Sequence, residues 1–149
     1  MGRVIANASM SLDGYIAKDD NTIGRLFDWL QNGSVEVPTV DDRITFHLSP
    51  PSAEYWQQWV GGLGALVCGR TLFDFTDGWG GRHTMDVPVV VVTHSVPTEW
   101  VDAHPDAPFS FVPTGVDDAP LGDPTVCIQG TQVTHLSFPV ARGDGPEPA

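Results

Sequence analysis

Hydrophobic residues along the chain gather in short runs separated by turn residues, and this pattern predicts mainly strands. Runs rich in β-branched or aromatic residues cover residues 3–10, 65–68, 87–95, 109–112, 125–128 and 134–140. The run Val89–Val92 is the strongest, because unbroken β-branched residues are typical of a strand buried on both faces in a parallel sheet. The last run alternates and contains Pro139, which predicts an edge strand or a bulge.

One segment predicts a long helix. Ser49–Ser52 is a helix-start signal, because proline is tolerated in the first turn of a helix. Ala53, Trp56, Val60 and Leu63 then recur at roughly helical spacing, and a cluster of glycines ends the pattern.

Shorter elements are expected on either side of this helix. Residues 69–75 turn out of a strand into a short helix, with Thr71 as a possible N-cap and Asp74 three residues further on. Residues 31–51 are rich in loop residues, with scope for a short helix at residues 40–48.

Strands that alternate with a few helices predict an α/β layer fold. A chain of 149 residues suits one domain, which we place at residues 1–140. Residues 141–149 have the Gly- and Pro-rich composition of a flexible tail.

The charge balance narrows the classes of partner. Seven Lys and Arg stand against 19 Asp and Glu, giving a net charge of −12, and such a surface repels nucleic acid. No apolar run approaches the ~20 residues of a membrane span, and the N-terminus lacks the pattern of a signal peptide. We therefore expect a cytoplasmic protein without nucleic-acid or membrane partners, in which an anionic ligand would depend on one of the few arginines.

Cysteine and histidine spacing argues against a metal site. Cys68 and Cys127 lie at the ends of two apolar runs and lack CxxC spacing, which predicts buried free thiols. The five histidines are scattered without metal-ligand spacing, so no metal is expected.

Four polar turns follow predicted strands, where ligands of open α/β sheets bind. These turns are residues 11–14, 69–71, 93–95 and 129–131. The second turn offers the best chemistry, because Gly69 lets a ligand approach the backbone, Arg70 can grip an anion and Thr71 opens a helix whose amides attract phosphate. The alternative is an ordinary strand-to-helix turn with a solvent-facing arginine.

The third turn, Thr93-His94-Ser95, offers hydroxyl groups and a histidine that could contact a second phosphate. A plain solvated strand exit is the alternative. The sequence contains neither a nucleophile elbow nor a P-loop, so covalent hydrolysis and P-loop nucleotide binding are poorly supported.

Four segments in this order carry a resemblance: VIANASMSLDGYIA, GALVCGRTLFDF, DGWGG and VPVVVVTHSVP. Together they resemble the reductase domain of riboflavin-biosynthesis deaminase/reductases, in the dihydrofolate reductase-like superfamily. The resemblance implies a three-layer fold with a central, mostly parallel sheet flanked by helices. It also implies a cytoplasmic homodimer that binds NADPH and transfers hydride to a pyrimidine- or pterin-like small molecule, as a 5-amino-6-(5-phosphoribosylamino)uracil reductase does.

The same resemblance assigns the cofactor-binding residues in three groups. The nicotinamide side would be lined by Ala6, Ser11, Asp13, Gly14 and Ile16. The pyrophosphate would lie on Gly69, Arg70 and Thr71. The adenosine ribose and its 2′-phosphate would lie near Thr93, His94 and Ser95.

On the substrate side the resemblance implies that Glu54 is the catalytic proton donor, although its position also suits a first-turn helix residue favoured by the helix dipole. Four further side chains could wall a flat-ring substrate pocket or could belong to the core. They are Asp28, Trp29, Phe73 and Trp79.

The resemblance breaks near the C-terminus. Family members carry a glycine pair and then a helix before the last hairpin, whereas here Gly130 and Thr131 lead almost directly into the next strand. Gly130 and Thr131 would keep part of the cofactor contact, but one family helix is expected to be missing. A non-catalytic, shortened relative that acts as a nucleotide-binding or dimerisation module is therefore the alternative function, and a flavin-binding protein is a third.

Overall fold

The computed structural model describes residues 4–11, 15–20, 22–113, 126–130 and 133–139. The predicted tail and the site residues Asp13, Gly14 and Thr131 lie outside this part of the chain. The chain divides into two compact units. Unit 1 comprises Met1–Val37, Phe46–Gln57 and Asp118–Ala149, unit 2 comprises Pro38–Thr45 and Gln58–Asp117, and each is described by itself.

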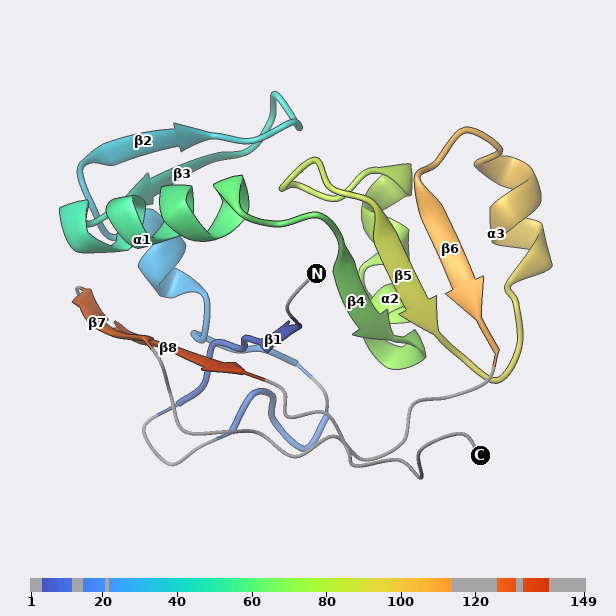
Figure 1. The fold of residues 1–149 in the computed structure, drawn as a ribbon, viewed down its shortest axis with the longest axis horizontal. Coiled ribbons are helices and arrows are strands. Elements are labelled where there is room, and N and C mark those ends of the chain that lie inside the picture. The colour runs from blue at the N-terminus through green and yellow to red at the C-terminus, as the bar shows by residue number, and fades with distance from the viewer. Residues whose placement is uncertain (1–3, 12–14, 21, 114–125, 131–132, 140–149) are drawn as a thin grey trace, which may run out of the picture. The chain divides into compact units, whose positions relative to one another are not determined.

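A parallel sheet forms the centre of unit 2 (Figure 1). Its strands are β4 (Leu66–Gly69), β5 (Val89–Val92) and β6 (Phe109–Val112), in the order β4-β5-β6. The β-branched run predicted as a parallel strand is the middle strand β5, and this prediction is confirmed. Only one of its faces is fully buried, because Val89 and Val91 are 1% and 0% exposed whereas Val90 and Val92 are partly exposed.

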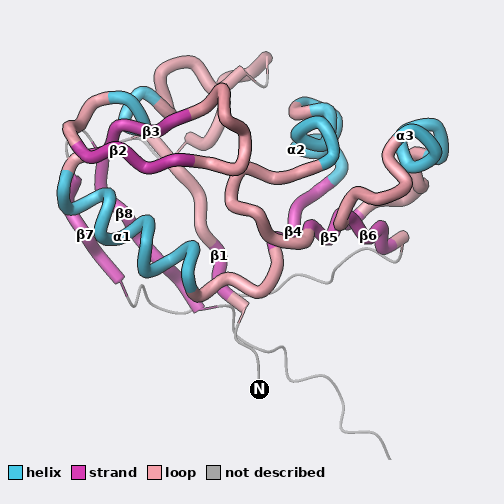
Figure 2. The backbone as a smooth tube through the Cα atoms, turned by 90° about the horizontal axis from the view of Figure 1, so that it is seen from above, coloured by secondary structure: helices cyan, strands magenta, loops and turns pink. Residues whose placement is uncertain are grey.

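Two short helices cover one face of this sheet, as Figure 2 shows for α2 (Arg70–Phe75) and α3 (Thr98–Ala103). The predicted helix after β4 is therefore present, but its predicted cap is wrong. Gly69 precedes the helix in an extended conformation and Thr71 lies inside the first turn. Asp74 binds the Arg70 side chain instead of completing a cap at Thr71.

Unit 1 contains an antiparallel sheet in the order β1-β8-β7. It is formed by β1 (Ile5–Ala6), β7 (Val126–Gly130) and β8 (Val133–Pro139). The edge position predicted for the last strand is wrong, because β8 pairs on both sides. Pro139 is the last residue of β8 and is paired in register with Ile5 of β1.

Only residues 131–132 separate β7 from β8. A helix cannot fit in this connection, so the predicted direct passage from one strand to the next is confirmed. Val133 and Thr134 belong to β8 rather than to the connection.

The expectation of loop and short helix between residues 31 and 51 is wrong, because this segment contains two strands. β2 (Val35–Pro38) pairs antiparallel with β3 (Thr45–Leu48). The Thr39 hydroxyl closes the turn between them by donating to the backbone oxygens of Asp41 and Ile44, at 3.1 and 2.9 Å.

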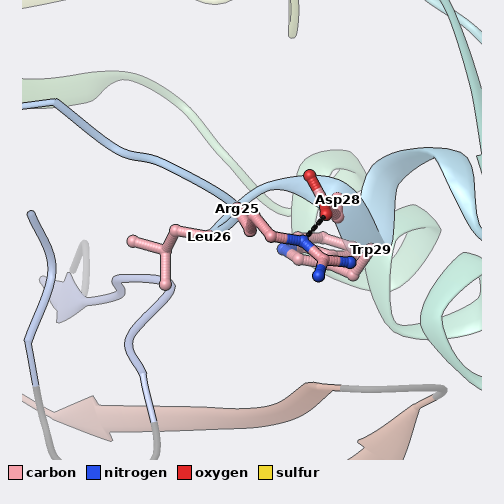
Figure 3. A pocket seen from close by; sticks show the side chains of 4 residues that line it. All are labelled: Arg25, Leu26, Asp28 and Trp29. Atoms are coloured by element: carbon pink, nitrogen blue, oxygen red, sulfur yellow. Dashed lines mark hydrogen bonds and ion pairs between the residues drawn. The ribbon is translucent and has the colours of Figure 1, made fainter.

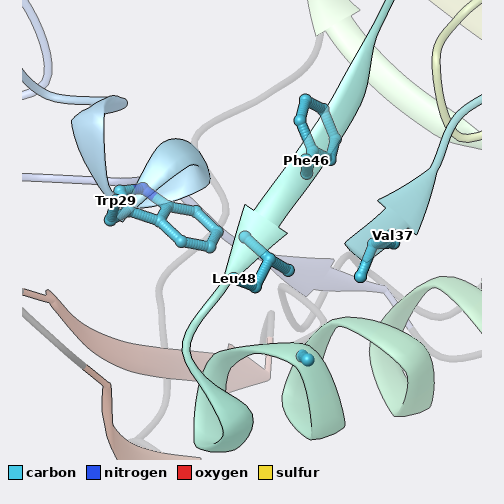
Figure 4. Close-up of a cluster of buried hydrophobic side chains, with 5 residues drawn as sticks. Trp29, Val37, Phe46 and Leu48 are labelled. Carbon is cyan, nitrogen blue, oxygen red and sulfur yellow. The ribbon is translucent and has the colours of Figure 1, made fainter. Parts of the chain in front are cut away.

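The predicted long helix is α1 (Pro50–Gly61), which begins at the Pro50-Pro51 signal and ends at the first glycine. It packs in a core with the β2–β3 hairpin and with the one-turn helix η1 (Asp28–Gln31). Figure 4 shows Leu48 and Val37 directed toward α1. This core consists of Trp29, Val37, Phe46, Leu48 and Ala53.

The fold is therefore mixed α/β, as predicted, but the described strands form three separate sheets of which one is parallel. No helix within the described residues is long and apolar enough to cross a membrane.

Candidate functional site

Two of the predicted turns meet at one edge of the parallel sheet. Gly69 and Val92 are paired in the β4–β5 register, so the residues after each strand leave the sheet side by side. Arg70 joins the two turns: its Nη1 donates to the backbone oxygen of Ser95 at 2.9 Å and its Nε to Asp74 Oδ1 at 2.6 Å. The guanidinium is thereby held in one orientation at the exit of β5.

The turn after β5 is closed by its own threonine. Thr93 is 4% exposed, its Oγ1 donates to the Ser95 oxygen at 2.8 Å, and the Ser95 amide donates to Thr93 Oγ1 at 3.3 Å. His94 and Ser95 are exposed. The buried hydroxyl of Thr93 therefore shapes the turn, and the polar groups open to a ligand are those of its neighbours and Arg70.

A shallow pocket of about 360 Å³ lies at this place. Its lining residues are Arg70, Val92, Thr93, His94 and Ser95. With one guanidinium, one imidazole and no carboxylate among these residues, the pocket suits an anion.

Gly69 borders this turn with open space where a side chain would be. Its φ of −83° and ψ of 165° suit any residue, and an added Cβ would meet no atom within 4 Å. Neither its backbone nor its packing requires glycine. Thr71, the third residue of the predicted turn, is exposed.

Arg70 also borders a second hollow of about 400 Å³ on its other side. Asp74, Asp77 and Glu99 contribute carboxylates there, beside Trp100. These carboxylates repel an anion, so an anionic ligand of Arg70 is favoured on the side of the β5 exit.

Phe73 and Trp79, predicted as possible pocket walls, belong to an aromatic cluster in unit 2. Phe73 is 2% exposed, and its ring packs edge-on against Trp100 at 4.9 Å and Phe111 at 5.3 Å. Trp79 packs against the ring of His83 at 4.5 Å. The burial of Phe73 agrees with the alternative that this side chain belongs to the core.

His83 is itself buried, and burial lowers its pKa to about 4. Its Nδ1 accepts the amide hydrogen of Met85 at 3.1 Å, which requires the neutral ring with the proton on Nε2. The histidine therefore holds a turn and is not a surface base.

Asp28 and Trp29, the other predicted pocket residues, line a hollow of about 260 Å³ in unit 1 together with Arg25 and Leu26 (Figure 3). Arg25 Nε donates to Asp28 Oδ2 at 2.7 Å. Trp29 is 7% exposed and its Nε1 donates to Ser9 Oγ at 3.3 Å. Both residues line this hollow, and their role in holding a substrate stays a prediction.

A buried polar cluster behind Trp29 was not predicted. His135 of β8 lies between the edge-on ring of Trp29 at 4.9 Å and the stacked ring of Tyr55 at 4.5 Å. Its Nε2 lies 3.0 Å from Ser52 Oγ, which accepts a hydrogen bond from Ser49 Oγ at 3.0 Å. Burial lowers the pKa of His135 and raises that of Tyr55.

Part of this cluster does have a signal in the sequence. Ser49, Ser52 and Tyr55 are spaced three apart, which places them along one face at the start of α1. His135, which contacts Ser52 and Tyr55, lies 83 positions from Ser52, and no local pattern connects it to them.

The remaining predicted residues of unit 1 that the structure describes lie on different parts of the chain. Ala6 is the last residue of β1, Ile16 is 60% exposed, and Glu54 is exposed on α1. Ser11 closes a local turn, in which its Oγ accepts the Tyr15 amide at 3.0 Å.

Gly130 is the last residue of β7 and pairs with Val133. Within the described residues, no group of three or more His, Cys, Asp or Glu side chains could hold a metal ion. Comparison of the chain with protein-family models, curated proteins and solved structures gives no match.

Proposed function

We propose that the protein is an NADPH-dependent reductase that transfers hydride to a pyrimidine- or pterin-like small molecule, in a dihydrofolate reductase-like fold. The observation that carries the proposal is the contact of Arg70 with the turn after β5. It joins two segments that the sequence had each assigned to the phosphates of this cofactor.

The residues at this turn fit the phosphate end of NADPH. Arg70 has five N–H donors, two of which are engaged by Asp74 and Ser95. A guanidinium at a fixed angle binds phosphate with good geometry, and the space beside Gly69 admits the ligand. His94 adds a ring nitrogen on the same pocket.

The charge of the chain makes this placement informative. The chain has a net charge of −12 and only seven Lys and Arg side chains. One of these few, Arg70, lines a pocket without a carboxylate among its lining residues. Asp74 weakens the local positive charge, so we expect moderate rather than tight binding of an anion.

When bound, NADPH supplies the hydride. In unit 2, Arg70, His94 and Ser95 would hold its phosphates. In unit 1, the resemblance gives Asp28 and Trp29 as walls for a flat ring, and Glu54 as the proton donor.

Titration of the protein with NADPH, followed by cofactor fluorescence, tests this proposal. Arg70→Ala removes the phosphate contact and should lower the affinity about 10-fold or more, since hydrogen bonds to charged groups contribute about 1.5–3 kcal/mol. Arg82→Ala is the matched control, because Arg82 makes the same i,i+4 pair with Asp86 but does not line the pocket.

Gly69→Ala gives a second, independent variant. Its Cβ meets nothing in the folded chain, so stability should be kept while NADPH binding weakens. Equal affinities of wild type, Arg70→Ala and Arg82→Ala, or no binding at millimolar NADPH, would overturn the proposal.

The alternative is a nucleotide-binding module without catalysis. The direct connection between β7 and β8 favours it, because a helix end that could add binding energy is missing there. NADPH binding without oxidation of the cofactor in the presence of pyrimidine and pterin substrates would support this alternative over a reductase.

A further inference from the structure

We propose that Asp74 is a positioning residue of the Arg70 site, which holds the guanidinium in the orientation that meets an anion and whose own charge limits the affinity for that anion. The inference rests on the proposed function, because NADPH is the anionic ligand chosen for its test. All the residues that carry it lie in unit 2.

Helix stability does not account for the pairing of Asp74 with Arg70. The helix α2 has six residues, of which Arg70 is the first and Asp74 the fifth. A pair at i,i+4 supports a helix best when the acidic residue precedes the basic one, because this order agrees with the helix dipole. Here the order is reversed. The side chains of Arg70 and Asp74 are also 35% and 52% exposed, so their pair adds little to the stability of the helix.

The pairing does anchor a contact between two segments of the chain. Arg70 Nη1 donates to the Ser95 oxygen at 2.9 Å, across 25 positions of the sequence, while Nε donates to Asp74 Oδ1 at 2.6 Å. The Ser95 oxygen is itself fixed, because it also accepts from Oγ1 of the buried Thr93 at 2.8 Å. Two contacts on different nitrogens thus hold the guanidinium, and Asp74 supplies the one on Nε.

The other arginine–carboxylate pairs of the described residues lack this second anchor. Arg82 makes the same i,i+4 pair with Asp86, but its Nε and Nη2 both contact the same carboxylate oxygen, at 2.8 and 2.7 Å. The Arg82 side chain is 60% exposed, and those of Arg25 and Arg43 are 89% and 87% exposed. Arg70, at 35%, is the least exposed of the four, which is expected for a side chain held against a second segment.

Asp74 acts through Arg70, because it is not among the residues that line the pocket at the exit of β5. An arginine has five N–H donors, and the three that remain after the contacts with Asp74 and Ser95 lie on Nη1 and Nη2. A ligand therefore meets the terminal nitrogens, while Asp74 occupies Nε. The negative charge of Asp74 still reduces the attraction between Arg70 and an anion, so the same residue improves the geometry of the site and weakens its charge.

Two substitutions separate these effects. Asp74→Asn keeps an oxygen that accepts from Nε and removes the charge, whereas Asp74→Ala removes both. We expect Asp74→Asn to raise the affinity for NADPH about 3–10-fold, since one opposing charge near the site is lost. Asp74→Ala should bind about 3–10-fold more weakly than Asp74→Asn, because the freed Arg70 side chain must then be immobilised on binding. Cofactor fluorescence measures both affinities.

The Nε–H signal of Arg70 in the ¹⁵N-labelled full chain reports the orientation of the guanidinium without a ligand. It should be shifted away from the signals of exposed arginines in wild type and in Asp74→Asn, and should move to their position in Asp74→Ala. A residue that only stabilised the helix would lower the thermal stability in both variants and leave no such difference between them. Asp86→Asn and Asp86→Ala are matched controls at the Arg82 pair, and neither should change the affinity for NADPH.

The inference is overturned if Asp74→Asn and Asp74→Ala bind NADPH with equal affinity, or if the Arg70 Nε–H signal is the same in both variants. The proposed function fails in a different way, when NADPH does not bind to wild type. Inorganic pyrophosphate, followed by calorimetry in the same proteins, then replaces NADPH as the probe. A weaker affinity of Asp74→Ala than of Asp74→Asn for pyrophosphate supports the inference, and equal affinities or the absence of binding overturn it.

Discussion

Five consecutive residues of unit 2, Asp77–Gly81, have a positive φ, which side chains normally avoid. Gly78, Trp79 and Gly80 have φ values of 55°, 51° and 64°, a left-handed region that costs a residue with a Cβ roughly 1–2 kcal/mol. Trp79 bears this cost, and its ring packs on His83 at 4.5 Å. Asp77, with a φ of 49°, is the other residue of this turn that has a Cβ at positive φ, and the remaining three are glycines.

Two of these glycines differ in their surroundings, which gives a matched pair of substitutions. A Cβ on Gly78 would lie 2.5 Å from Trp100 Cζ2 and 2.8 Å from Phe73 Cε2, whereas on Gly80 it would meet nothing within 4 Å. We expect Gly80→Ala to lower the free energy of unfolding by about 1–2 kcal/mol and Gly78→Ala by about 3 kcal/mol or more. Urea unfolding followed by tryptophan fluorescence measures both, and equal losses would contradict the overlap with Trp100.

His83 predicts a dependence of stability on pH. Burial lowers its pKa to about 4 in the folded chain, against an unfolded value of about 6.5. Between these values the unfolded chain binds more protons, so stability is fully present above pH 6.5 and falls as the pH drops toward 4. The expected loss is at most about 3 kcal/mol, measured by urea unfolding across this range.

His83→Asn is the control for this titration. Asparagine keeps an acceptor near the Met85 amide but does not titrate, so the slope of stability against pH should decrease. We expect part of the slope to remain in this variant. Burial also lowers the pKa of His135, so this residue too makes stability fall as the pH decreases. An unchanged slope would show that His83 is not the group responsible.

At the scale of elements, the sequence was informative where one element carries its own signal. The run Val89–Val92 identified β5, and the Pro50-Pro51 signal placed the start of α1. The β2–β3 hairpin was missed because each strand has only four residues, too few for alternation to stand out from a polar loop. The helix α3 was missed for the same reason, since six residues show little periodicity.

The alternating burial of β5 can be tested by making the same isosteric substitution, valine to threonine, separately at two neighbouring positions. Val91 is 0% exposed, whereas Val90 is partly exposed. Val91→Thr buries a hydroxyl without a designed partner and should lower the free energy of unfolding by about 1–3 kcal/mol. Val90→Thr should cost clearly less in the same chemical denaturation experiment, and a reversed order would contradict the assigned faces of the strand.

At the scale of the whole molecule, the two units each have their own cluster of buried side chains. Length and composition do not report such a division, and the prediction of one domain over residues 1–140 stays a prediction. The Arg70 turns could be predicted because neighbouring parallel strands end at one edge. The His135 cluster could not, because its members come from distant parts of the sequence.

The homodimer also stays a prediction. The net charge of the chain determines the pH at which its association should be measured. With a net charge of −12 and an isoelectric point near 4.4, the molecule loses the repulsion between copies in mildly acidic solution. We expect solubility to pass through a minimum near pH 4.4, seen as a maximum in light scattering. Sedimentation at neutral pH is then the fair measure of association, and constant scattering from pH 7 to 4 would contradict the expectation.

The pairing of β1 with β8 joins the first and the last strand that the structure describes. On the ribosome, the parallel sheet of unit 2 can form as soon as residue 117 has emerged, whereas β1 must wait for the β7–β8 hairpin. Translation proceeds at about 5–20 residues per second, so Trp29 and Tyr55 remain without His135 for a further second or more. During this interval the aromatic side chains of unit 1 lack this partner, and slow codons between residues 117 and 139 would prolong that exposure.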